Sequence, residues 1–212
     1  TPNLDQMARD GAQFDKFYSA STVCAPTRCS LMTGKDQGHA AIRGNKEIGG
    51  WELNSGEGQE PLPTAEITIA ERLRAEGYAT GICGKWGLGG PGSVGRPTEQ
   101  GFDFFFGYLC QRQAHNYYPT HLWKNDDVYI LDKNRYFSAH QKAPKEGAVD
   151  FSAYRGGQYS VDLIEDEAIG FVRRNAQRPF FLYLAPTLPH AALQAPPELV
   201  DAYPREWDAK PY

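Results

Sequence analysis

The chain has 212 residues, 41% of them hydrophobic, which is enough to bury one ordinary core, so we expect one domain rather than two. Its net charge of −4 argues against a nucleic-acid backbone or an anionic membrane surface as the main partner. Four cysteines are too few for a disulfide scaffold at this length, and no stretch approaches the roughly 20 apolar residues of a membrane span.

The first predicted element is a helix over about ten residues. It ends at Gly11, and its apolar face consists of Leu4, Met7 and Ala8. Residues 12–19 are rich in aromatic side chains and favour a strand.

The next two predicted elements are helices. Pro26 stands where a helix could begin, and Gly34 stands where that helix would end. Thr68 with Glu71 has the spacing of a capping box and predicts a second helix, closed by Gly77. A short strand over residues 78–83 should follow.

The middle of the chain, residues 86–157, carries many Gly, Pro and aromatic residues without a sustained period. We interpret it as long ordered loops within the same domain. Its large aromatic side chains would not stay solvated in a disordered segment; they are Phe102, Phe104, Phe105, Phe106, Tyr117, Tyr118 and Trp123.

The last predicted elements are a helix and a strand. Ser160 starts an amphipathic helix, and residues 180–184 form a continuous apolar run typical of a strand covered on both faces. The inner side of the helix is expected to carry Val161, Ile164, Ala168, Phe171 and Val172.

Repeated helix-then-strand order with a doubly buried strand predicts an α/β fold with a mostly parallel sheet flanked by helices. Ligands of such folds bind beyond the carboxyl ends of the strands. Three segments should meet there: the loop with Cys24, residues 84–86, and the segment that ends at His190.

A candidate anion site lies around Cys24, just before the helix whose first turn is set by Pro26. Unpaired N–H groups and the positive end of the helix dipole favour a bound anion there. Arg28 adds a cation nearby in the sequence. The spacing alone favours the alternative, a buried cysteine before an ordinary proline-initiated helix. Cys83 and Cys110 are expected to be small buried hydrophobic residues.

Several motifs together resemble the type I, formylglycine-dependent sulfatases of the alkaline phosphatase superfamily. Residues 24–28 match the Cys-x-Pro-x-Arg signature that directs oxidation of the cysteine to formylglycine, although Thr27 stands where Ser is commoner. The other matching segments, in the family's order along the chain, are residues 1–14, 77–86, 101–103 and 179–190.

The resemblance implies a truncated sulfatase N-terminal catalytic domain that hydrolyses sulfate esters by means of calcium and a formylglycine made from Cys24. In such enzymes one hydroxyl of the hydrated aldehyde attacks sulfur and displaces the alcohol. The other hydroxyl then loses its proton, and collapse to the aldehyde expels sulfate. The implied partners are a sulfated small molecule or carbohydrate and the formylglycine-generating enzyme. Secretion or periplasmic export is the implied location.

The resemblance also implies roles for individual residues. Cys24, as formylglycine, is nucleophile and calcium ligand, and Arg28 orients it. Lys85 binds the sulfate, and His190 contacts the ester and helps to protonate the leaving oxygen. The ordinary alternatives are a surface lysine, a helix-surface arginine and a core histidine.

One position departs from the family pattern. Many relatives have a histidine that hydrogen-bonds the formylglycine where this chain has Gly87. We take His115 as the candidate substitute, because it lies in an aromatic loop that could fold over the pocket; packing among tyrosines is the alternative. His39, His121 and His140 have no motif support and are assigned no role.

Other expected groups have no counterpart in the sequence. The remaining calcium ligands and a second sulfate-binding lysine are expected before Thr1 and beyond Tyr212, so we expect a fragment of a longer enzyme that is inactive alone. Asp126 and Asp127 form an acidic pair, but their polar surroundings indicate a solvated turn.

Two other functions remain open at this point. One is a formylglycine-dependent phosphonate monoester or phosphodiester hydrolase, and the other is a truncated, non-catalytic anion-binding module. For a sulfatase, the aromatic side chains of Tyr117, Tyr118 and Trp123 could stack on sugar rings, which favours a sulfated carbohydrate over an aryl ester.

Overall fold

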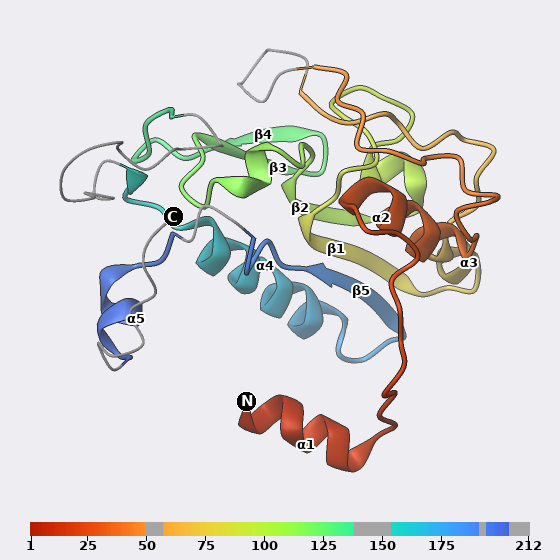
Figure 1. Ribbon diagram of the computed structural model, residues 1–212, viewed down its shortest axis with the longest axis horizontal. Helices are drawn as coiled ribbons and strands as arrows, with labels where there is room; N and C mark the ends of the chain where they lie inside the picture. Colours follow the sequence, from red (N-terminus) through yellow and green to blue (C-terminus); the bar gives the residue numbers. More distant parts are fainter. Residues whose placement is uncertain (50–56, 138–153, 191–193, 204–212) are drawn as a thin grey trace.

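The computed structural model describes residues 1–49, 57–137, 154–190 and 194–203 (Figure 1). Its elements in chain order are α1 (Pro2–Asp10), α2 (Cys24–Thr33), α3 (Ile69–Ala75), β1 (Ala79–Lys85), η1 (Pro97–Gln100), β2 (Phe104–Tyr108), η2 (Gln113–His115), β3 (His121–Lys124), β4 (Asp127–Ile130), α4 (Ser160–Asn175), β5 (Phe180–Ala185) and α5 (Pro197–Asp201).

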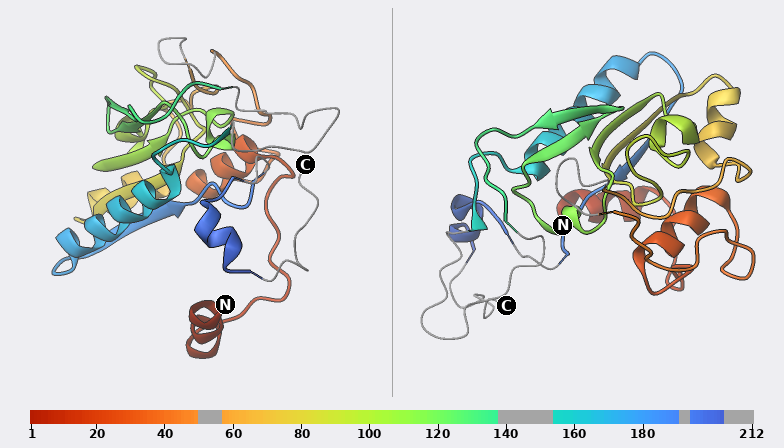
Figure 2. Two further views of the ribbon diagram at one scale, coloured as in Figure 1. Left: turned by 90° about the vertical axis from the view of Figure 1, so that its left-hand side faces the viewer. Right: turned by 90° about the horizontal axis from the view of Figure 1, so that it is seen from above.

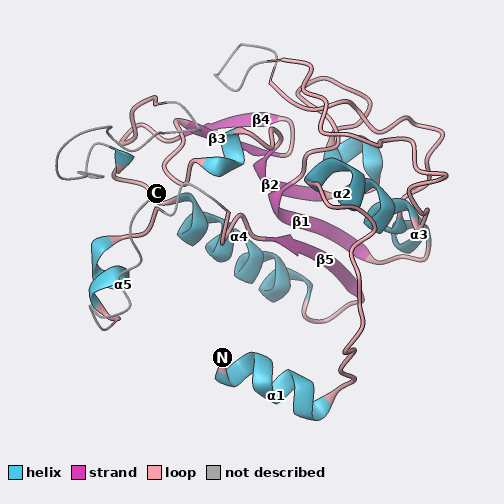
Figure 3. Ribbon diagram, viewed as in Figure 1, coloured by secondary structure: helices cyan, strands magenta, loops and turns pink. Residues whose placement is uncertain are grey.

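The strands form one sheet in the order β4-β3-β2-β1-β5 (Figure 3). β1 is parallel to both β2 and β5, while β3 is antiparallel to β2 and β4 is antiparallel to β3. The predicted α/β fold is confirmed, and a hairpin of β3 and β4 extends its parallel part.

Helices cover the two faces of this sheet (Figure 2). Alternate side chains of a strand point to opposite faces. Ile82 and Phe105 therefore belong to the core cluster that contains α2, whereas Cys83 and Phe106 belong to the cluster with Ile164 of α4. β1 and β2 are thus packed on both sides, and the predicted burial of Cys83 and Cys110 is confirmed.

Residues 1–20 differ from the prediction. α1 forms as expected, but residues 1–20 are exposed, and the expected apolar face is open, with Leu4 62% and Met7 69% exposed. The predicted strand over residues 12–19 is wrong. A strand needs a neighbour for its backbone hydrogen bonds, and no strand in the described part of the chain pairs with this segment.

The region 86–157 is ordered as predicted where it is described, but treating it as loops is wrong for β2, β3 and β4. The hairpin turn contains Asn125 at φ 53°, a conformation that Asn tolerates well. Asn125 also accepts a hydrogen bond from the Phe105 N–H at 2.9 Å, which ties the turn to β2. These short strands gain their stability from neighbours rather than from a local pattern.

The remaining helices follow the prediction closely. The capping box is present, because the Glu71 N–H donates to Thr68 Oγ1 at 3.1 Å and the Thr68 N–H donates to Glu71 Oε2 at 2.7 Å. α4 begins at Ser160 as predicted and buries Ile164, Ala168 and Phe171, but Val172 on its expected inner side is 38% exposed.

β5 forms as predicted but is only partly covered. Leu184 is 53% exposed, and among the described strands β5 is an edge strand. The expectation of a strand covered on both faces is therefore wrong for β5. The description fits β1, every residue of which is buried.

Candidate active site

The structure brings Cys24 and Lys85 together. Cys24 is the first residue of α2. The helix therefore begins two positions before Pro26, where its start was predicted. Lys85 is the last residue of β1, and its Nζ donates to Cys24 Sγ at 3.6 Å. Two of the three segments expected beyond the carboxyl ends of the strands therefore meet.

Lys85 is a buried cation at this site. Its side chain is buried, with the residue only 4% exposed. Burial lowers the pKa of Lys85, the nearby Arg28 charge lowers it further, and Cys24 opposes both effects. A cation removed from water in this way interacts strongly with any anion that enters beside Cys24.

Arg28 links three elements of the site. Its Nη1 donates to the backbone carbonyl of Lys85 and, at 3.3 Å, to the hydroxyl of Tyr183. One side chain of α2 therefore holds the last residue of β1 and a residue of β5. Arg28 fixes the end of β1 that presents the lysine and adds a second positive charge.

The start of α2 offers fewer free N–H groups than the sequence suggested. The Ala25 N–H donates to Asn45 Oδ1 at 2.8 Å, Pro26 has no N–H, and the Thr27 N–H bonds to the Val23 carbonyl at 3.3 Å. Three positions of the first turn are thus closed to an anion. Side-chain cations, rather than a row of backbone N–H groups, make this site attractive to anions.

Asn45 acts as a tertiary cap of α2, which gives a prediction about stability. We expect Asn45→Ala to lower the free energy of unfolding by about 1 kcal/mol, because the Ala25 N–H loses its acceptor. Urea unfolding measures this change. Asn45→Asp retains an oxygen acceptor and is the control; equal losses in both variants would contradict a capping role.

His115 and His190 form a second group. Their rings stack with centroids 3.6 Å apart and an interplanar angle of 9°. The Tyr117 hydroxyl donates to the His190 carbonyl at 2.8 Å. Burial raises the pKa of Tyr117 to about 12, so this hydroxyl remains a donor at neutral pH. The two histidines nominated separately from the sequence therefore lie together.

The polar residues that the sequence left without a role pair elsewhere where the structure describes them. His39 pairs with Asp36 at 3.0 Å on the surface, and His121 is buried against Glu57 at 2.7 Å. His140 lies outside the described residues. Asp126 lies in the β3–β4 turn, as predicted, and pairs with Arg96 at 3.0 Å.

The described residues do not fit a calcium site. Nowhere in the described part of the chain do three His, Cys, Asp or Glu side chains group as metal ligands. Calcium prefers several oxygen ligands, and carboxylates above all, whereas the side chain placed against Cys24 is the Lys85 cation. We therefore derive no step through calcium.

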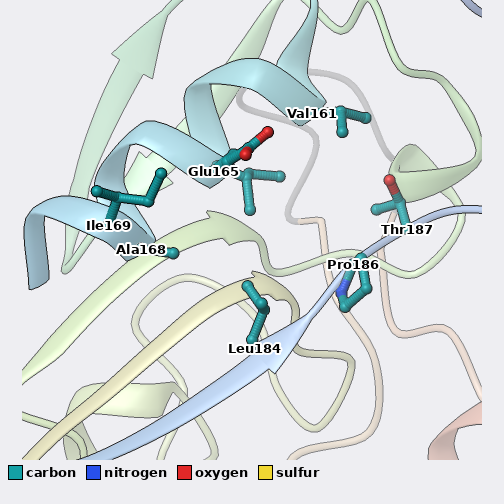
Figure 4. A pocket seen from close by; sticks show the side chains of 8 residues that line it. Val161, Glu165, Ala168, Ile169, Leu184, Pro186 and Thr187 are labelled. Atoms are coloured by element: carbon teal, nitrogen blue, oxygen red, sulfur yellow. The ribbon is translucent and has the colours of Figure 1, made fainter. Parts of the chain in front are cut away.

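A separate hollow of about 310 Å³ lies between α4 and the end of β5 (Figure 4). Its lining is mainly apolar and includes Ile164, Ile169 and Leu184, with Glu165 as its charged residue. No cation is among the described residues that line it. This hollow is therefore not the anion site.

The structure is that of an α/β protein with a buried lysine against Cys24 at the end of a parallel strand. The chain matches the Sulfatase family over residues 1–210 and belongs to that family.

Individual relatives support this assignment. The chain is 30% identical to arylsulfatase G of Mus musculus over 218 residues, covering 94% of this chain and 38% of the relative. It is 32% identical to N-acetylgalactosamine-6-sulfatase of Canis lupus familiaris over 211 residues, covering 92% and 36% respectively. The chain thus spans less than half the length of these two relatives.

Solved structures share the fold. The crystal structure of Ps i-CgsB in complex with k-i-k-neocarrahexaose superposes with a TM-score of 0.70 at 28% identity. The match covers 97% of this chain and 43% of that one. Within the described ranges, no helix has the length and apolar character needed to cross a bilayer.

Proposed function

We propose that the protein to which this chain belongs hydrolyses sulfate esters of carbohydrates and that Cys24, converted to formylglycine, carries the nucleophile. The observation that supports this most directly is the contact of the buried Lys85 cation with Cys24 at 3.6 Å. Membership of the Sulfatase family supports the choice of a sulfate ester.

The chemistry divides among a few residues. Formylglycine at position 24, once hydrated, would supply a hydroxyl that attacks the ester sulfur. Lys85 binds an equatorial oxygen of the sulfate and offsets the charge that develops on it. Arg28 keeps the end of β1 in place and adds positive charge.

The histidine pair is proposed to serve the leaving group. His190 donates a proton to the departing alcohol oxygen, and His115 holds the ring of His190 in one orientation by stacking on it. Tyr117 fixes the backbone of the same turn through the His190 carbonyl. In this proposal His115 acts through His190, while position 87, where many relatives have a histidine, is glycine.

A carbohydrate substrate is supported by the relatives and not by the aromatic residues. Tyr117, Tyr118 and Trp123 are buried, at 0%, 4% and 8% exposure, so the idea that they stack on sugar rings is wrong. They fill the core instead. The names of two similar proteins, an N-acetylgalactosamine-6-sulfatase and Ps i-CgsB bound to an oligosaccharide, favour a sugar ester.

The proposal includes maturation and location. The formylglycine-generating enzyme would oxidise Cys24, and export to the periplasm or secretion would follow the family pattern. Cys24 is partly exposed at the start of α2, within the Cys-x-Pro-x-Arg segment that resembles the family's modification signature.

Two measurements on the full-length protein test this proposal. Peptide mass spectrometry across residues 21–28 should show the mass change from thiol to aldehyde. Turnover of sulfated oligosaccharides should exceed turnover of an aryl phosphodiester. An unmodified thiol in a fully active enzyme contradicts the mechanism, and preference for the phosphodiester supports the alternative hydrolase.

A further inference from the structure

The site contains a buried amide group that the catalytic assignments above do not use. Gln111 is only 4% exposed, yet neither Nε2 nor Oε1 of its side chain has a hydrogen-bond partner among the described residues. A buried primary amide without partners is unfavourable, because it has lost its water without replacement. Such a group beside an active site indicates a ligand that completes its hydrogen bonds.

Gln111 lies beside the segment that presents Lys85. In the parallel register of β1 and β2, Lys85 pairs with Tyr108. The two segments stay side by side beyond these strands, because the Gly87 N–H donates to the Leu109 carbonyl at 3.2 Å. Cys110, the neighbour of Gln111, is close enough to affect the pKa of Lys85. Gln111 therefore stands at the same end of the sheet as the lysine.

Gly87 makes room for this amide. A Cβ at position 87 would lie 2.5 Å from Gln111 Cγ and 3.0 Å from its Oε1, so the glutamine fills the space a side chain there would take. Gly87 also has φ +81°, which disfavours other residues. The Gln111 side chain, from the loop after β2, therefore occupies the space that a side chain at position 87 would need.

The position of Gln111 is fixed by its surroundings. Its backbone N–H donates to Gln59 Oε1 at 2.7 Å. The Tyr108 hydroxyl donates to the Asn116 carbonyl at 2.8 Å, which closes the loop that carries Gln111. The backbone of Gln111 is thus held in place before any ligand arrives.

We propose that Gln111 is a substrate-binding residue whose amide hydrogen-bonds the sulfate group bound beside Cys24 and Lys85. Its Nε2 donates to a sulfate oxygen, and its Oε1 accepts from a hydroxyl of the bound sugar. That the ligand is a sulfated sugar rests on the proposed function. Binding of an oxyanion by Gln111 next to Lys85 does not depend on it.

Two substitutions in the full-length, matured protein test this inference. Gln111→Met keeps the length and removes both polar atoms, and Gln111→Glu keeps the shape but removes the donor and adds a negative charge. We expect kcat/KM on a sulfated sugar to fall roughly 10- to 100-fold in the methionine variant and further in the glutamate variant. Inhibition by inorganic sulfate should weaken in the same order.

Thermal unfolding separates a binding role from a structural one. Gln111→Met should not lower Tm, because it removes an unpaired buried amide. Gln100→Met is the matched control: Gln100 is also buried, but its Nε2 donates to the Val94 carbonyl at 2.8 Å. That variant should lower Tm and leave sulfate inhibition unchanged.

The outcomes are distinct. A fall in Tm for Gln111→Met with unchanged kinetics and sulfate inhibition overturns the inference. Titration calorimetry with inorganic sulfate gives a readout independent of turnover. If the wild-type protein cleaves no sulfate ester but loses sulfate affinity on Gln111→Met, the proposed function fails and the binding role stands.

Discussion

Replacement of Cys24 by alanine is expected to reduce sulfate-ester hydrolysis by about 1,000-fold or more, because the covalent route loses its nucleophile. Little structural cost should accompany this loss, since Cys24 is partly exposed at the start of α2. Initial rates on a sulfated sugar, together with Tm, measure both effects.

Cys29 provides the matched control for this experiment. It lies five residues further along the same helix, but it is fully buried in the core cluster. Cys29→Ala should lower the free energy of unfolding by about 1 kcal/mol and keep most of the activity. Full activity in the Cys24→Ala protein would refute the mechanism proposed here.

Replacement of Lys85 by methionine should have the second largest effect. We expect kcat/KM to fall by about 100-fold or more, because the sulfate loses a buried cation beside Cys24. Stability should rise at neutral pH, since burial of the charged lysine opposes folding. Lys35→Met is the surface control, because Lys35 pairs with Glu66 at 2.7 Å and is solvent-accessible.

The same lysine predicts a pH dependence of stability. Its folded pKa is lowered below the ordinary 10.5, so between these two pKa values the unfolded chain binds more protons than the folded one. The free energy of unfolding should therefore rise with pH in that window, and this rise should be absent in Lys85→Met. Urea unfolding at a series of alkaline pH values tests it; identical slopes in both proteins would contradict it.

The sequence predicted those parts of the fold that have local signals. The capping box at Thr68, the amphipathic pattern after Ser160 and the apolar run from residue 180 all produced the expected elements. β3 and β4 carry no such pattern, because their stability comes from sheet neighbours. β2 does carry an apolar run, Phe104 to Phe106, and assigning it to a loop missed this signal. An Asn-Asp turn at residues 125–126 was the one available signal for the hairpin.

The residues of the candidate site also separate into those that motifs predicted and those that motifs could not reveal. The roles expected for Cys24, Lys85 and His190 came from motif resemblance, and they remain predictions to be tested. Asn45 and Gln111 could not be found from motifs, because each acts on a residue 20 or more positions away. For Gln111 the only hint was glycine at position 87, which marked space for another side chain.

Arg28 has a consequence for how the pocket responds to substrate. Because one guanidinium joins α2 to two parallel strands, the backbone that carries Lys85 is fixed before any substrate binds. This end of β1 is preorganised, so ordering it consumes no binding energy.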